Sequence, residues 1–154
     1  MKRFFLVVIL CTIALALKSR DYVDLGLPSG TLWCSGNESG YYTYDKAVST
    51  FGHKLPTEKQ MNELVTACKW TWNKRGYYIV KGPNGKTIIL PANGYISKSF
   101  NPNKSVTYKG YQGYYWSRTP DIWDYAIGLF IASYNISVNG GADRGHGYSV
   151  RLVK

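Results

Sequence analysis

The stretch YYIVKGPNGKTIIL, residues 77–90, decides the fold class. Two runs rich in aromatic and β-branched residues, Tyr77–Val80 and Thr87–Leu90, flank Gly82–Gly85, whose glycines, proline and asparagine are typical of a turn. This pattern predicts a β-hairpin. Residues 91–113 form an expected long loop, and a meandering antiparallel sheet is predicted to continue through apolar runs at 114–117, 125–133, 135–138 and 147–153.

Upstream of the hairpin the pattern changes to that of a helix. Thr57 follows a proline and has Gln60 three residues later, which is a capping box. The apolar residues that follow at i, i+3, i+4 and i+7 share one helix face: Met61, Leu64, Val65 and Cys68. A shorter helix is expected at 44–51, after strands at 22–27 and 31–34. One or two early helices before an antiparallel sheet predict an α+β domain.

The composition indicates a folded, basic domain. The 154 residues carry 19 Lys and Arg against 9 Asp and Glu, a net charge of +10, and 45% are apolar, which excludes a disordered chain. The positive charge favours an anionic partner. The alternative is that scattered Lys and Arg residues only keep the protein in solution.

The N-terminal residues have the pattern of a secretory signal peptide. Basic Met1–Arg3 precede the apolar run Phe4–Ile13, and Ala14–Ala16 supply a cleavage site. A bilayer span requires roughly 20 apolar residues, more than the 14 of Phe4–Leu17. We therefore predict a signal peptide at 1–16 and a single domain at 17–154. The mature protein would be periplasmic, secreted or on the cell surface, without a membrane span, and export argues against a nucleic-acid partner.

The cysteines allow two interpretations. Signal cleavage removes Cys11 and leaves Cys34 and Cys68, which could form one disulfide in an oxidising compartment or remain two buried thiols. A metal site is not expected, because no CxxC motif occurs and only His53 and His146 could contribute imidazoles. No cofactor is predicted.

The segment after residue 117 combines exposed aromatic residues with amides. Tyr and Trp provide rigid contact area and Asn provides adaptable hydrogen bonds, as in binding paratopes. The predicted ligand-binding residues are Trp123, Tyr125, Tyr134, Asn135, Asn139 and Arg144. The alternative for each aromatic residue is a place in the core or a strand.

Several motifs occur in an order that resembles a known family. They are YVDLGLPSGTLW at 22–33, LPTE at 55–58, CKWTW at 68–72, GPNG at 82–85, GYYWS at 113–117 and GYSVR at 147–151. Over residues 21–154 the chain resembles the Fibrobacter succinogenes major paralogous domain, a family of exported proteins common in Bacteroidetes. The resemblance implies a C-type-lectin-like fold whose N- and C-terminal strands pair, with residues 32–34 near 148–152.

The resemblance also bears on function. Variable proteins of this fold bind ligands through the segment that corresponds to 118–146 here. The copper-binding cysteine pair of related enzymes is missing, because no cysteine follows Cys68, and the calcium motifs of classical lectins are missing as well.

The leading hypothesis is a secreted or surface-displayed, non-catalytic, adhesin-like module that binds a glycan or protein on a cell surface. One alternative is a structural or assembly subunit of a cell-surface complex. The other is an enzyme acting on surface polymers through the carboxylates Asp121, Asp124 and Asp143.

Overall fold

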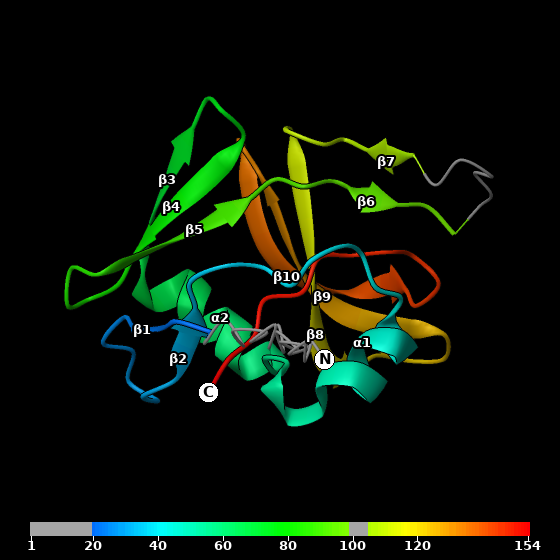
Figure 1. The fold of residues 1–154 in the computed structure, drawn as a ribbon, viewed down its shortest axis with the longest axis horizontal. Helices are drawn as coiled ribbons and strands as arrows, with labels where there is room; N and C mark the ends of the chain where they lie inside the picture. The colour runs from blue at the N-terminus through cyan, green and yellow to red at the C-terminus, as the bar shows by residue number, and fades with distance from the viewer. Residues whose placement is uncertain (1–19, 99–104) are drawn as a thin grey trace, which may run out of the picture.

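The structure, a computed structural model, describes residues 20–98 and 105–154 (Figure 1). The predicted signal peptide at 1–16 and Cys11 lie outside the described residues. The predicted domain at 17–154 begins three residues before them.

Strands dominate the described residues. The helices are α1 (Tyr44–Phe51), the 3-10 turn η1 (Gly52–Lys54) and α2 (Glu58–Ala67). The strands are β1 (Tyr22–Asp24), β2 (Leu32–Cys34), β3 (Lys69–Asn73), β4 (Tyr77–Lys81), β5 (Thr87–Pro91), β6 (Tyr95–Ile96), β7 (Val106–Thr107), β8 (Gln112–Pro120), β9 (Tyr125–Ala132) and β10 (Asn135–Asp143).

These strands form four small antiparallel sheets, with strand orders β1-β2, β3-β4-β5, β6-β7 and β10-β9-β8. The predicted α+β, C-type-lectin-like class is therefore wrong, and the fold is β-rich. Two helices of 8 and 10 residues are too short to form a helical layer. The meander that we expected as one sheet is divided because each hairpin pairs only with its immediate neighbours in sequence.

Local predictions are confirmed where one short segment determines the structure. The capping box at α2 is complete: Thr57 Oγ1 accepts from the Gln60 amide at 3.2 Å, and Gln60 Oε1 accepts from the Thr57 amide at 2.9 Å. The hairpin at residues 77–90 is β4–β5, with Val80 opposite Ile88. The helix expected at 44–51 is α1, capped by the Thr43 side chain.

The expected loop at 91–113 contains a further hairpin. Tyr95 pairs with Thr107 and Ile96 with Val106, which defines the two-residue strands β6 and β7. Strands this short carry no alternation that a sequence pattern can show. Figure 1 shows this hairpin reaching away from the body of the protein beside β8.

The sheet β8–β9–β10 separates two hydrophobic clusters. Tyr115 and Leu129 face a cluster that includes Met61 and Leu64 of α2. On the opposite face, Trp116 belongs to a second cluster that includes residues of α1. Neighbouring residues of a strand point to opposite faces, so β8 contributes to both clusters.

The residues after 147 pair with several strands and form no strand of a sheet, contrary to the strand expected at 147–153. Isolated bridges join Val153 to Trp33, Ser149 to Tyr115 and Tyr148 to Tyr42. Backbone hydrogen bonds at 2.9 Å connect Cys34 N to Leu152 O and Leu32 N to Lys154 O. Residues 32–34 thus lie beside the C-terminal segment, as expected, within an architecture that differs from the expected one.

A buried arginine fixes this segment in place. Arg151 is 2% exposed. Its guanidinium donates to Asn37 Oδ1 at 2.7 Å, to Cys34 O at 2.8 Å and to Ile89 O at 2.5 Å. Burial lowers its pKa, because desolvation disfavours the cation. One side chain therefore connects β2, the following loop and β5.

The candidate disulfide is not formed, because Cys34 and Cys68 are both free. Cys34 is buried in the second cluster, whereas Cys68 ends α2 and packs against the first. Burial raises the pKa of the Cys68 thiol to about 11, so this thiol is protonated at neutral pH.

No helix among residues 20–98 and 105–154 is long and apolar enough to cross a membrane. Within the same ranges, no three His, Cys, Asp or Glu side chains gather in a way that could hold a metal ion.

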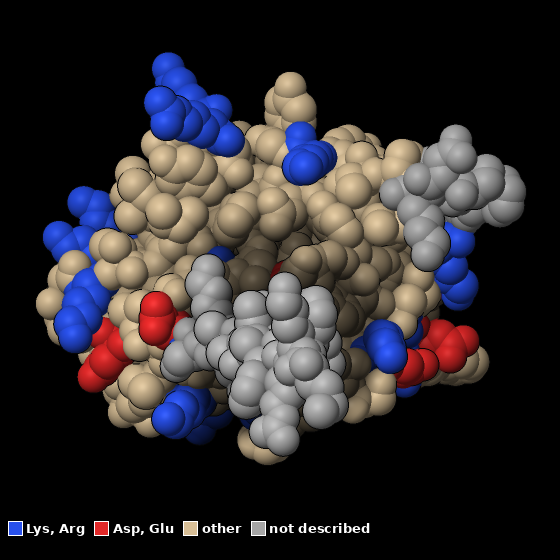
Figure 2. Space-filling view, viewed as in Figure 1, with Lys and Arg blue, Asp and Glu red and all other residues tan. Residues whose placement is uncertain are grey.

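Positive charges are dispersed over the surface. Figure 2 shows Lys and Arg in separate groups around the margin of one face, with Asp and Glu among the lower groups. The described residues visible in this view carry no single continuous basic patch.

Candidate functional site

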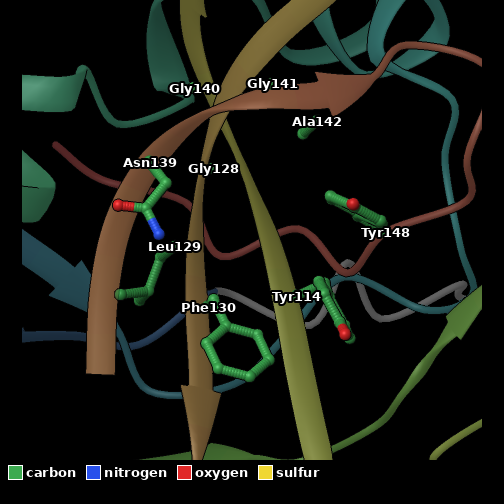
Figure 3. A pocket seen from close by; sticks show the side chains of 9 residues that line it. All are labelled: Tyr114, Gly128, Leu129, Phe130, Asn139, Gly140, Gly141, Ala142 and Tyr148. Atoms are coloured by element: carbon green, nitrogen blue, oxygen red, sulfur yellow. The ribbon is translucent and has the colours of Figure 1, made fainter. Parts of the chain in front are cut away.

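A hollow of about 220 Å³ opens on one face of the sheet β8–β9–β10 (Figure 3). We call it the sheet hollow. Its lining comes from all three strands and from the C-terminal segment: Tyr114, Gly128, Leu129, Phe130, Asn139, Gly140, Gly141, Ala142 and Tyr148.

Glycines in the strands create this space. Gly128 lies in the middle of β9, and Gly140 and Gly141 interrupt the pairing of β10 between Asn139 and Ala142. Asp121 Oδ2 accepts a hydrogen bond from the Gly141 amide at 2.7 Å, and a Cβ at Gly140 would lie 2.1 Å from that same oxygen. Glycine is therefore required where the Asp121 carboxylate holds the bulge.

Aromatic rings line the side of the sheet hollow opposite the β10 bulge. The ring centroids of Tyr114 and Tyr148 lie 5.0 Å apart, and those of Tyr114 and Phe130 lie 5.2 Å apart. Tyr95 extends the group, 4.9 Å from Tyr114, and is followed by His146, 5.2 Å from Tyr95. We call these five residues the ring cluster. Because the rings hold each other in edge-on and tilted contacts, their surface is preorganised.

The lining of the sheet hollow is uncharged. Burial raises the pKa of Tyr114 to about 12 and raises that of Tyr148 as well, so both phenols are neutral at physiological pH. The exposed amide of Asn139 donates one hydrogen bond, at 2.7 Å, to Ser137 Oγ. An amide has two donor hydrogens and one acceptor oxygen, so Asn139 retains hydrogen-bonding capacity for a ligand.

An ion pair and an imidazole border the ring cluster. Lys98 Nζ lies 3.2 Å from the Asp143 carboxylate, and the Lys98 amide donates to His146 Nδ1 at 3.0 Å. Burial lowers the pKa of His146, which keeps the imidazole neutral at pH 7. Hydrogen bonds from the Gly145 amide and from Lys98 lower the pKa of Asp143.

The three carboxylates of the enzyme hypothesis have unequal surroundings. Asp121 holds the β10 bulge, and the exposed Asp124 lies in the β8–β9 turn. A general acid needs a raised pKa, whereas that of Asp143 is lowered. Asp121 and Asp143 thus use their carboxylates in hydrogen bonds within the protein.

The structure places the predicted ligand-binding residues in separate parts of the molecule. Trp123, which is 86% exposed, lies with Tyr125 and Arg144 at the β8–β9 turn. Tyr134 and Asn135 lie just beyond the other end of β9, whose last residue, Ala132, is seven residues from Tyr125, or roughly 24 Å along a strand.

Of the six predicted residues, Asn139 lines the sheet hollow. Arg144 makes intramolecular contacts: its Nε donates to Tyr125 O at 2.9 Å, and its guanidinium lies 4.8 Å from the centre of the Tyr44 ring. The six residues therefore do not form one site.

Tyr134 lines a second hollow, of about 260 Å³, which we call the edge hollow. It lies where the β3–β4 turn meets the ends of β8 and β9. Its lining residues are Trp72, Lys74, Gly110, Tyr111, Gln112, Ser133 and Tyr134.

The sequence interpretation missed the ring cluster because it searched for a site in loops. Tyr114 and Phe130 are strand residues within long apolar runs, and such runs predict burial on both faces. Glycine inside a strand was the available signal, since Gly128 and the pair Gly140–Gly141 mark places where another group approaches the backbone.

Comparison with known proteins identifies one family. No curated protein and no solved structure matches this chain. A family model described as a domain of unknown function (DUF8237) matches residues 70–153, more than half of the chain. The match includes every lining residue of both hollows. The chain therefore belongs to the DUF8237 family.

Proposed function

We propose that this protein is a non-catalytic binding domain that holds a carbohydrate against the ring cluster in the sheet hollow. The observation that supports this is an uncharged hollow in which Tyr114, Phe130 and Tyr148 face the same open space (Figure 3). Ligand sites are mostly apolar cavities with a few placed polar groups, and Asn139 is such a group here.

The chemistry of a sugar suits this surface. One face of a pyranose ring carries C–H groups and can stack on an aromatic ring, while hydroxyls at the edge form hydrogen bonds. Burying apolar surface contributes about 25 cal/mol per Å², and rings that are already packed lose little freedom on binding. The rings of Tyr114 and Phe130 would supply the stacking surface, and the Asn139 amide would bind a hydroxyl.

Export and display on a cell surface stay predictions from the N-terminal sequence and from the resemblance to the Fibrobacter family. Both fit a binding domain that meets glycans outside the cytoplasm. The lowered pKa of Asp143 and the structural contacts of Asp121 favour binding over hydrolysis.

A glycan array at low and high salt, with three variants, tests this proposal. Ala142→Phe fills the hollow, Asn139→Ala removes the exposed amide, and Trp123→Ala removes the exposed ring at the β8–β9 turn. We expect salt-resistant binding that falls at least tenfold in Ala142→Phe, falls in Asn139→Ala and is unchanged in Trp123→Ala. Circular dichroism shows whether Ala142→Phe has folded, and Asn139→Ala provides an independent test if it has not.

Two results would contradict the proposal. Binding lost only in Trp123→Ala would move the site to the β8–β9 turn. If the unchanged protein bound no glycan, the alternative function of an assembly subunit would be favoured.

A further inference from the structure

We infer that the ligand is an acidic polysaccharide, whose chain extends from the sheet hollow into the edge hollow and places a carboxylate or sulfate beside Lys74. This inference rests on the proposed function, since it assumes that a sugar occupies the sheet hollow. It adds a second binding site and the charge class of the ligand.

The edge hollow offers aromatic surface that contacts within the protein leave uncovered. Tyr111 is 75% exposed and Tyr134 is 76% exposed, and both line this hollow with the half-buried Trp72. Large exposed apolar side chains that gather around a concave surface mark an interaction site. A sugar chain would find ring faces here as well as in the sheet hollow.

Gln112 contacts lining side chains of both hollows. It lines the edge hollow, and its Oε1 accepts a hydrogen bond from Tyr114 Oη, in the sheet hollow, at 2.5 Å. Its Nε2 lies 3.4 Å from Tyr134 Oη. Gln112 and Tyr114 are two residues apart on β8, so their side chains share one face and are separated by roughly 7 Å along the strand. A chain of several sugars, unlike a single sugar, can contact both hollows.

The positive charge of Lys74 in the edge hollow favours an anionic ligand. Lys74 is the only charged residue of its lining, and no salt bridge within the described residues engages Lys74. Arg75 lies beside it in the β3–β4 turn, where the Arg75 amide donates to Asn73 Oδ1 at 2.9 Å. Figure 2 shows Lys and Arg atoms at the tip that β3 and β4 form in Figure 1, and the acidic side chains of that view lie well away from it.

An amine next to exposed rings suits a sugar acid. The ring faces bind the pyranose, and the ammonium of Lys74 pairs with its carboxylate or with a sulfate ester. Cleavage of the predicted signal peptide would remove Lys2 and Arg3 and leave a net charge of +8, which supports the approach of such a polymer at low ionic strength.

The test measures affinities, by calorimetry or on an array, for paired oligosaccharides of two and six sugars. The acidic members are oligogalacturonate, hyaluronan and heparin fragments, and the uncharged partners are the carboxyl-reduced or desulfated forms. We expect at least one acidic hexamer to bind tenfold more tightly than its uncharged partner. Lys74→Ala should abolish this difference, whereas Lys86→Ala, in the exposed β4–β5 turn, should preserve it.

Tyr134→Ala tests whether one sugar chain contacts both hollows. We expect it to reduce hexamer affinity to that of the dimer and to leave dimer affinity unchanged. The inference alone is overturned if uncharged and acidic chains bind equally, or if Lys86→Ala and Lys74→Ala weaken binding to the same degree. Failure of the proposed function looks different, because the unchanged protein would then bind no oligosaccharide of either length or charge.

Discussion

The rings of Trp116 and Tyr148 are stacked, with their centroids 4.1 Å apart and their planes 23° from parallel. Trp116 is fully buried in β8, and Tyr148 belongs to the C-terminal segment that pairs with this strand through a parallel bridge between Ser149 and Tyr115. Tyr148 also lines the sheet hollow. The stack therefore connects the core to the proposed binding surface, so the shape of the hollow depends on how the segment around Tyr148 packs alongside β8.

Replacing Tyr148 with alanine should destabilise the protein and remove one side of the hollow. The loss of a buried aromatic ring costs about 3–5 kcal/mol of unfolding free energy. Tyr148→Phe retains the stacked ring and should cost much less. Urea unfolding of both variants measures the difference, and a cost below about 1 kcal/mol for the alanine variant would show that the stack matters little.

Arg151→Met should destabilise the protein by at least about 3 kcal/mol, because it leaves the buried acceptor on Cys34 and the partly buried acceptors on Asn37 and Ile89 without their donor. The exposed Arg118 offers a control, and Arg118→Met should change stability by less than about 0.5 kcal/mol. Thermal or urea unfolding compares the two. Equal effects would mean that the buried bonds of Arg151 are unimportant.

Thr57→Ala should cost about 1 kcal/mol, because the first turn of α2 loses the acceptor for the Gln60 amide. Thr57→Ser keeps a hydroxyl at this position and should recover most of the loss. Urea unfolding of the two variants gives the comparison. An alanine variant as stable as the parent would contradict the role of the capping box.

Stability should decline as the pH falls below about 6.5, because the folded state holds His146 with a lowered pKa. Below this pH His146 binds a proton in the unfolded chain but stays neutral in the folded one. The contribution of neutral His146 to folding stability is therefore complete above the pKa that His146 has in the unfolded chain, and it is lost as the pH falls through the pKa that His146 has in the folded protein. His146→Asn keeps an acceptor for the Lys98 amide without the titration. Its melting temperature should vary less between pH 7 and pH 5, and an unchanged profile would assign the pH dependence to other groups.

Trp123→Gly should stabilise the protein by about 1 kcal/mol, because Trp123 has φ of 57°, a left-handed conformation that is unfavourable for bulky residues. The side chain is almost fully exposed, so its removal costs little packing. Unfolding measurements on Trp123→Gly and Trp123→Ala, which keeps a Cβ, isolate the backbone effect. No gain from glycine over alanine would mean that this turn carries no strain.

The sequence predicted the elements that depend on neighbouring residues. Thr57 and Gln60 are three positions apart, and the hairpin at residues 77–90 contains its own turn, so both were recognisable without the rest of the fold. The class was wrong because the division into four sheets depends on pairings that local patterns do not encode. The state of the cysteines stayed open for a related reason, since nothing near Cys34 or Cys68 shows which cluster each side chain joins, and the structure has the second alternative, two free thiols.

The candidate site was predictable only in part. Trp123 and Tyr134 are close in sequence, but β9 lies between them and carries them to opposite ends of a sheet. Asn139 was identified, yet the rings that line the same hollow were read only as strand residues because they are embedded in apolar runs. The sheet hollow depends on Gly128, where the absence of a side chain leaves space, and a search for functional side chains overlooks such a position.

The pairing of residues 32–34 with 152–154 has a consequence for the rate of folding. Cys34 and Leu152 are 118 positions apart, so this contact forms only after a long stretch of chain has closed into a loop. Folds dominated by such distant pairings reach the native state in milliseconds to seconds, which is slow for a small domain. A newly made chain of this kind therefore stays unfolded for longer than a domain of the same size whose contacts are mostly local.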